Sequence, residues 1–270
     1  MNQWQKKIVN SWLKKMRRVR IIPVLTLQNE KLVKTIRFKN PTYIGDPINA
    51  VKIFNEKEVD EIVILDISAT KEKREPNYNK IEEIASEAFM PFAYGGGVTN
   101  LNQIEKLFKL GIEKVVLNSV LENNLNLISE AAKIFGSQSV VASIDVKKNI
   151  FGKEQAYKIS GTTKINLSLV EYIKQLENAG AGELFVNSID RDGTYQGYDL
   201  ALIKQVSSLV NLPIIACGGA SSIDSFLPAV QHGASAIAAG SMFIYTGSTR
   251  GILINYPKQE DLVSKVYTKI

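Results

Sequence analysis

The chain has 270 residues, 45% of them hydrophobic, and a formal net charge of +6 at pH 7. This length and composition suffice to bury one large core or two small ones. No apolar run approaches the roughly 20 residues that cross a bilayer, and the start lacks the apolar core of a secretory signal. We therefore expect no membrane span and a cytoplasmic location.

Basic residues gather before the first predicted strand. Residues 4–20 hold seven basic side chains and no acidic one, a composition that can bind nucleic acid or an anionic surface. Because the remaining charges are mixed in sign, we interpret residues 1–18 as a solvated leader helix or a start-site extension. Met16 is then an alternative start, and we expect no nucleic-acid partner.

Metal-binding side chains are scarce. Cys217, the single cysteine, lies in an apolar strand, and His232, the single histidine, precedes a glycine at a predicted helix end. This pattern excludes disulfides and a metal site built on His and Cys. We expect a reducing compartment, no metal and no cofactor.

Short β-rich runs alternate with helix-period segments along the whole chain. The predicted strands are Arg20–Leu27, Ile62–Asp66, Pro91–Tyr94, Lys114–Asn118, Val140–Asp145, Glu183–Ser188, Pro213–Cys217 and Ala236–Ala239. The predicted helices lie near Pro47–Glu56, Asn79–Phe89, Asn100–Leu110, Leu125–Phe135, Leu167–Ala179, Leu200–Leu209 and Ser222–Val230. Continuously apolar strands indicate a parallel sheet covered on both faces, and eight of them predict an α/β fold of the (β/α)8 TIM barrel type. An open doubly wound sheet is the alternative, but no G-x-G-x-x-G follows the first strand.

An internal repeat supports the barrel. The segment PFAYGGGVTNLNQIEKLFKLGIEKVVLNS (Pro91–Ser119) aligns without gaps with PIIACGGASSIDSFLPAVQHGASAIAAGS (Pro213–Ser241), at a spacing of 122 residues. The first and fifth strands align at a spacing of 119, which sets Thr26 opposite Asp145. We therefore predict a two-fold half-barrel repeat within one closed domain over residues 19–270.

Glycines and small polar residues follow four of the predicted strands. After the third and fourth strands they are Gly96, Gly97, Asn118 and Ser119, and after the seventh and eighth they are Gly218, Gly219, Gly240 and Ser241. Glycine lets backbone N–H groups approach a ligand, and a following helix N-terminus favours an anion. Ordinary βα turns are the alternative for one such loop. Two matched pairs favour two phosphate sites and a ligand with two separated anionic ends.

Two strands end on aspartate. Asp145 ends the fifth strand within the apolar run VVASID, where partial burial should raise the pKa of its carboxyl and suit it to acid or base catalysis. Asp66 ends the second strand, where a role in capping the following loop is an alternative.

The loop after the sixth strand and a lysine after the first supply further polar groups. SIDRDGT (Ser188–Thr194) carries Asp190, Asp192 and Gly193 before a tight turn, and Lys34 lies in KLVKT. Active sites of TIM barrels are built at the C-terminal ends of the strands, so these residues are candidates for substrate binding. A solvated lysine is the alternative for Lys34.

Four charges stand at the opposite end of the predicted barrel. Arg20, Glu61, Lys114 and Glu183 each lie at or beside the start of a strand. Charges at strand starts are usually solvated. Two cations and two anions can instead form a salt-bridged ring that plugs the barrel floor.

Together these residues resemble the HisF-type cyclase subunit of imidazole glycerol phosphate synthase. The resemblance runs from Val19 to about Phe243 and includes RIIP, GDP (Gly45–Pro47), the LDI of the second strand, GGG, FGSQ, SIDRDGTYQGYD (Ser188–Asp199) and PIIACGGA. It implies that a partner glutaminase docks at the floor. Ammonia then passes a charged gate and the lumen to a bis-phosphate substrate at the top.

The resemblance also assigns residues. It maps the gate onto Arg20, Glu61, Lys114 and Glu183. It maps the phosphate contacts onto Gly97, Asn118 and Ser119 on one side and onto Asp192, Gly193, Gly219, Gly240 and Ser241 on the other. The acid/base pair of this family consists of two aspartates. Asp145 matches one, and Thr26 stands where the resemblance places the other, so we expect impaired cyclisation.

Two further stretches resemble the HisF-like glycosyl amidation-associated proteins of surface polysaccharide biosynthesis, Lys34–Glu61 and the tail RGILINYP (Arg250–Pro257). That resemblance implies a glutaminase partner and an N-acetyl sugar amidotransferase that converts an acetamido into an acetamidino group on a nucleotide sugar. The enzyme's substrate is then a nucleotide sugar or another phosphorylated small molecule. One alternative is a true cyclase of histidine biosynthesis. Another is a non-catalytic barrel that binds and activates the glutaminase.

Overall fold

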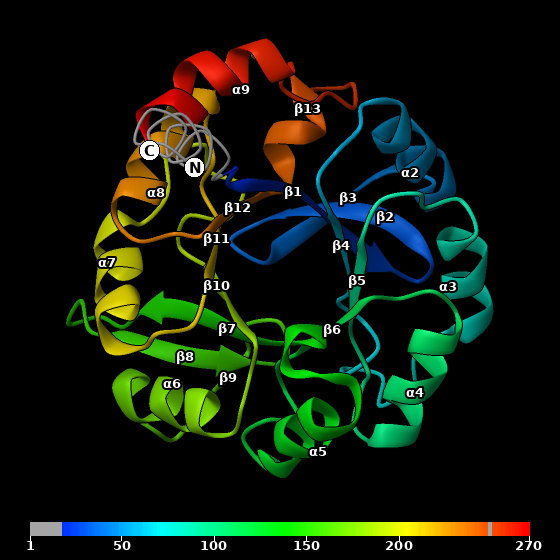
Figure 1. Cartoon of the computed structure of the whole chain (residues 1–270), viewed down its shortest axis with the longest axis vertical. Helices are drawn as coiled ribbons and strands as arrows, with labels where there is room; N and C mark the ends of the chain where they lie inside the picture. The colour runs from blue at the N-terminus through cyan, green and yellow to red at the C-terminus, as the bar shows by residue number, and fades with distance from the viewer. Residues whose placement is uncertain (1–17, 248–249) are drawn as a thin grey trace, which may run out of the picture.

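The computed structural model describes residues 18–247 and 250–270, which form a closed barrel of parallel strands surrounded by helices (Figure 1). The barrel strands are β1 (Arg20–Gln28), β4 (Ile62–Asp66), β5 (Phe92–Gly95), β6 (Lys114–Leu117), β7 (Val140–Lys148), β10 (Glu183–Ser188), β11 (Ile214–Cys217) and β12 (Ala236–Ala239). Pairing of β7 with β10 and of β12 with β1 closes the ring. The predicted TIM barrel is confirmed, whereas the predicted leader, except Arg18, and the alternative start at Met16 lie outside the described residues.

The helices surround the strands as a ring in Figure 1. They are α2 (Pro47–Glu56), α3 (Tyr78–Ala85), α4 (Leu101–Lys109), α5 (Asn126–Phe135), α6 (Leu169–Asn178), α7 (Leu200–Leu209), α8 (Phe226–Gln231) and α9 (Gln259–Lys265). The predicted helix at Ser222–Val230 divides into a 3-10 turn at Ile223–Ser225 and the short α8. Within the described ranges, no helix is long and apolar enough to cross a membrane.

Helix caps repeat between the two halves of the barrel. The side chain of Asn77 accepts a hydrogen bond from Lys80 N at 3.2 Å at the start of α3, and Asp199 does the same for Leu202 N at 3.1 Å at the start of α7. Asn77 and Asp199 are 122 residues apart, the spacing of the sequence repeat. The half-barrel repeat thus extends to the side chains that start the helices.

Antiparallel hairpins extend two barrel strands beyond the mouth, and the sequence analysis did not predict them. β2 (Lys31–Ile36) and β3 (Lys39–Gly45) follow β1, while β8 (Glu154–Lys158) and β9 (Thr163–Lys164) follow β7. A third small hairpin joins β13 (Tyr245–Thr246) to β14 (Gly251–Ile252). Mixed polar and apolar composition concealed these short strands, because β2 is buried only over Leu32–Lys34 and β8 only at Ala156.

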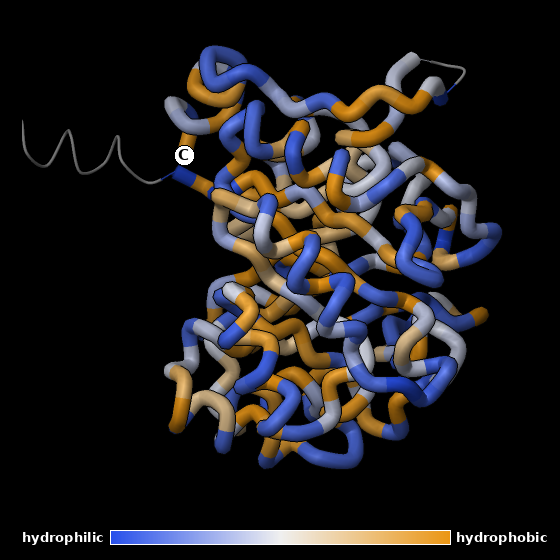
Figure 2. The backbone as a smooth tube through the Cα atoms, turned by 90° about the vertical axis from the view of Figure 1, so that its right-hand side faces the viewer, coloured by the Kyte–Doolittle hydropathy of each residue, from blue (hydrophilic) through white to orange (hydrophobic). Residues whose placement is uncertain are grey.

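The apolar residues form two layers, one inside the barrel and one between the strands and the helices. In β1, Ile22 and Val24 belong to the inner cluster, whereas Ile21 and Leu25 belong to the outer one. In the side view of Figure 2, hydrophobic stretches run through the interior of the body and hydrophilic ones dominate its turns. Since side chains alternate along a strand, Arg20 and Thr26 share the inner face of β1, at the floor and at the mouth.

Gly182, which precedes β10 at the floor, is closely packed against the backbone of a neighbouring loop. A Cβ at Gly182 would overlap the backbone carbonyl of Ser137, which cannot turn aside like a flexible side chain. We therefore expect Gly182→Ala to lower the free energy of unfolding by about 2 kcal/mol or more in urea titrations.

Gly251→Ala is the matched control, because its nearest neighbour, Thr246 O, would lie 3.7 Å from the new Cβ. The control should change stability by less than about 0.5 kcal/mol. Equal effects of the two substitutions would contradict the packing at Ser137.

Candidate active site

A ring of four charged side chains closes the floor of the barrel. Arg20 donates to Glu61 and, over 2.7 Å, to Glu183 Oε1. Lys114 Nζ lies 3.0 Å from Glu61 Oε2 and 3.4 Å from Glu183 Oε2. Burial disfavours the charge on Arg20, but Glu61 and Glu183 outweigh it and raise the pKa of its guanidinium. Each anion contacts both cations, so the ring is balanced in charge and the predicted plug is present.

Apolar side chains fill the lumen above this ring. They come from all eight barrel strands and are Ile22, Val24, Val63, Ala93, Val116, Val141, Phe185, Ile215, Cys217, Ala236 and Ala238. With no charged group among them, this layer separates the charged floor from the polar residues at the mouth.

Asp145 lies at the mouth end of β7. The amide of Asn118 donates to Asp145 Oδ2 at 3.1 Å and to the carbonyl of Ser143 at 3.2 Å. Burial, assisted by the charge of Asp192 and opposed by the Asn118 hydrogen bond, raises the pKa of Asp145 to about 7. A carboxyl that titrates near neutral pH can both donate and accept a proton, as acid/base catalysis requires.

Thr26 occupies the mouth end of β1. It pairs with Leu65 of β4 on one side and with Val33 of β2 on the other. Its hydroxyl donates a hydrogen bond to the carbonyl of Val33. The side chain therefore fastens the β2–β3 hairpin to the barrel and supplies no second titrating group near neutral pH.

Lys34 reaches the mouth from β2 and is buried. Its Nζ donates to the carbonyl of Val24 at 2.6 Å, and it lies so close to Gly240 that a Cβ at that position would meet it. Burial lowers the pKa of Lys34 to about 8, and the negative charge of Asp192 opposes this shift. Asp192 itself accepts a hydrogen bond from Thr35 Oγ1 at 3.1 Å.

Glycine loops beside Lys34 form a small pocket, which we call the C-half cradle and define as Gly193, Gly219, Gly240 and Ser241. Gly193 and Gly219 have φ values of 68° and 101°, a left-handed conformation that suits glycine. Within the described residues, the N–H groups of Gly219 and Ser241 donate to no backbone carbonyl. These free donors fit an anion.

The matching loops of the first half form what we call the N-half cradle, defined as Gly96, Gly97, Asn118 and Ser119. Gly96 and Gly97 are also left-handed, with φ values of 121° and 72°. The hydroxyl of Ser119 accepts from Ile159 N at 3.0 Å and therefore connects this cradle to the β8–β9 hairpin. The residues predicted for the two phosphate sites thus lie in two separate groups at the mouth.

Comparison with known proteins agrees with this geometry. Residues 20–250 match the family described as "Histidine biosynthesis protein". The chain belongs to this family. A putative imidazole glycerol phosphate synthase subunit hisF2 of Pseudomonas aeruginosa is 50% identical over 89% of this chain and 96% of the relative. A putative subunit HisF of Leptospira borgpetersenii is 47% identical, over 91% and 98%. The subunit HisF of Petrotoga mobilis is 43% identical, over 84% and 90%.

The predicted HisF-type family is therefore confirmed. These relatives are named as subunits of imidazole glycerol phosphate synthase, which was the alternative interpretation of the sequence. Their names do not mention sugar amidation.

Two predicted residues of this HisF-type chain carry out structural tasks at the mouth. Asp66 Oδ1 accepts hydrogen bonds from Ser68 N and Ala69 N, and its Oδ2 lies 2.8 Å from Arg74 Nη2. Asp190 Oδ2 accepts from Lys148 N at 2.8 Å. Both carboxylates thus hold loops in place, as the capping alternative for Asp66 foresaw.

Sequence reasoning missed Asn187 of β10. Its side chain is buried beside Asp145 in the strand register, and its Oδ1 has no hydrogen-bond partner among the described residues. A buried acceptor without a donor is costly, so the position fits contact with a ligand. The signal in the sequence was a single amide within the apolar run LFVNS.

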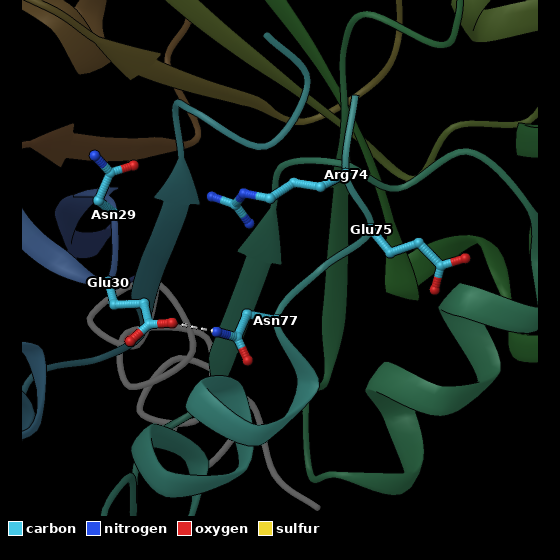
Figure 3. Close-up of a pocket in the computed structure, with 5 residues that line it drawn as sticks. All are labelled: Asn29, Glu30, Arg74, Glu75 and Asn77. Atoms are coloured by element: carbon cyan, nitrogen blue, oxygen red, sulfur yellow. Dashed lines mark hydrogen bonds between the residues drawn. The ribbon is translucent and has the colours of Figure 1, made fainter. Parts of the chain in front are cut away.

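A larger cavity of about 390 Å³ lies at the rim, lined by Asn29, Glu30, Arg74, Glu75 and Asn77 (Figure 3). Asn77 donates to Glu30 at 2.6 Å and also caps α3, while Arg74 is bound to Asp66 and Glu72. Asn77 and Glu30 are therefore paired with each other, and Arg74 is paired with carboxylates outside the cavity lining. We place the candidate site at the mouth instead.

The pKa of Asp145 predicts a pH dependence of stability. An unfolded aspartate ionises near pH 3.9, whereas Asp145 in the fold keeps its proton up to about pH 7. The folded state thus binds more protons in this window, so its stability falls as the pH rises. In urea titrations, the free energy of unfolding of Asp145→Asn minus that of wild type should therefore rise by up to about 4 kcal/mol between pH 4 and pH 8.

Asp224→Asn, at a carboxylate that is 70% exposed, controls for the loss of a surface charge. A difference between Asp145→Asn and wild type that does not change with pH would show that Asp145 is ionised in the fold.

Proposed function

We propose that this chain is the synthase subunit of a HisF-type complex, in which ammonia from a partner glutaminase enters at the floor and reacts at the mouth. One observation carries the proposal. The four-charge ring, the apolar lumen and Asp145 follow one another along a single barrel axis. This order matches a path from a guarded entrance to a catalytic group.

The floor offers a place for the partner. The exposed apolar side chains Phe89 and Ile134 precede β5 and β7, at the end of the barrel where the strands begin. Exposed large apolar groups at the same end of the barrel as a charged ring suit a protein–protein interface. We assign this face to a HisH-like glutaminase.

The lumen suits neutral ammonia. Transfer of an ammonium ion from water into an apolar layer costs much free energy, whereas transfer of a small neutral molecule costs far less. Side-chain movement in the ring and the layer would admit ammonia while water and ions stay excluded. At the mouth, Asp145 can take up or return a proton as ammonia adds to the substrate.

Two reactions fit this arrangement. The names of the relatives support cyclisation by imidazole glycerol phosphate synthase, in histidine biosynthesis, as the first candidate. Two cradles at one mouth suit its substrate, because each can bind one of two separated phosphates.

The second candidate is amidation of a nucleotide N-acetyl sugar, with an N-acetyl sugar amidotransferase as a further partner. Thr26 supports it, since the hydroxyl is engaged with Val33 and leaves Asp145 without a second acid at the mouth end of β1. Delivery of ammonia needs the ring, the lumen and the docking face, all of which are independent of Thr26.

Cyclisation with ammonium salt and the imidazole glycerol phosphate synthase substrate tests the first reaction. If the missing acid limits turnover, Thr26→Asp should raise the rate by about 10²-fold or more, the usual contribution of an acid/base group. Thr26→Asn is the matched control, since it has the shape of aspartate without its titration. Wild-type turnover at the rate of a HisF subunit would exclude a requirement for the second acid.

Substitution in the floor ring tests ammonia transfer. Lys114→Met removes one of the two cations that neutralise Glu61 and Glu183. The ratio of glutamine-dependent to ammonium-dependent product should fall by about tenfold, because the balanced ring guards the entrance. Lys265→Met, in an exposed pair with Asp224 in the loop after β11, controls for the lost charge. An unchanged ratio would contradict passage through the ring.

A further inference from the structure

An arginine from the C-terminal hairpin stands beside the C-half cradle. The guanidinium carbon of Arg250 lies 5.3 Å from the ring centre of Tyr195, and Nη2 donates to the carbonyl of Gly193 at 3.2 Å. The hydroxyl of Tyr195 donates to the carbonyl of Ser241 at 2.9 Å. The stacked pair is therefore hydrogen-bonded to the cradle at two points, Arg250 to Gly193 and Tyr195 to Ser241.

Both members of this pair have an unfavourable backbone conformation. Arg250 and Tyr195 have φ values of 52° and 60°, in the left-handed region that bulky residues adopt rarely. Arg250 lies in the turn between β13 and β14, where its N–H donates to Gly247 O. Glycine would adopt both conformations with less strain, yet both positions carry large side chains that contact each other.

The positive charge of Arg250 is not neutralised by a neighbour. Among the described residues, no carboxylate lies within ion-pair distance of its guanidinium. Beside the N-half cradle, by contrast, Arg74 is paired with Asp66 and Glu72. Among the described residues, the arginine beside the C-half cradle is therefore without a carboxylate partner, whereas the arginine beside the N-half cradle has two.

The C-half cradle already has what one phosphate needs, namely free backbone N–H groups and the nearby Nζ of Lys34. Arg250 adds a planar group with several N–H donors at the rim, a geometry that suits bidentate binding of phosphate. The stack on Tyr195 restricts the guanidinium and lowers the entropy lost on binding.

We propose that Arg250, held over Tyr195, binds the second phosphate of a diphosphate-bearing ligand whose first phosphate lies in the C-half cradle. This inference rests on the proposed function, because the cradle belongs to the phosphate sites assigned there. A ligand with two separated monophosphates would occupy the two cradles and leave Arg250 unused. A diphosphate ester, such as a nucleotide sugar, uses the cradle and Arg250 together.

Calorimetric titration of the full chain with inorganic phosphate and with pyrophosphate tests this assignment, without glutaminase or ammonia. Wild type should bind pyrophosphate more tightly than phosphate. Arg250→Gln should weaken the binding of pyrophosphate by about tenfold and the binding of phosphate by less than about twofold. Only pyrophosphate would lose a charge-assisted bidentate contact. Tyr195→Leu, which removes the stacking ring, should lower pyrophosphate affinity in the same direction.

Lys109→Gln is the control for net charge and should leave both affinities unchanged, since that side chain is 71% exposed on α4. Equal losses for both anions in Arg250→Gln, or no loss for either, would overturn the assignment. If Arg250→Gln fails to fold, Arg250→Lys decides, because it keeps the charge without the planar fork and should retain only part of the preference for pyrophosphate. Normal ammonia transfer combined with no such preference would refute this inference and leave the proposed function intact.

Discussion

Closure of the barrel by strand pairing is the constraint on which the other features depend. Because β7 pairs with β10 and β12 pairs with β1, alternate side chains of every strand must face one lumen. The same rule that sends Ile22 and Val24 inward places Arg20 below them and Thr26 above them. The charged floor, the apolar layer and the polar mouth are therefore three successive layers along the inner face of the barrel.

The two half-barrels share a framework but differ in chemistry. Repeated glycines and repeated helix caps give both halves a similar cradle. At the mouth, however, Asp145 lies near the end of β7 while Thr26 lies near the end of β1, and the Arg250–Tyr195 pair lies beside the C-half cradle. The side chains that we propose for proton transfer and for additional anion binding thus both belong to the half that follows β6.

The sequence predicted the barrel well because continuous apolar strands and a repeat leave few alternatives. It also brought Asp145, Lys34 and both cradles to one end, since all of them follow strands at the same edge. Prediction failed at the hairpins, where short half-buried strands carry little periodicity. Arg250 could not be placed either, because its contact with Tyr195 joins segments far apart in the chain and depends on backbone conformations that composition does not reveal.

The hydrogen bond from Thr26 to the carbonyl of Val33 couples the chemistry at the mouth end of β1 to the position of the hairpin. A threonine at this position donates a proton to that carbonyl, whereas an ionised aspartate would present a second acceptor to it and lose the bond. The hairpin that brings Lys34 into the mouth is therefore adapted to the hydroxyl. Aspartate at this position would therefore supply an acid at the cost of one bond that holds the hairpin to the barrel.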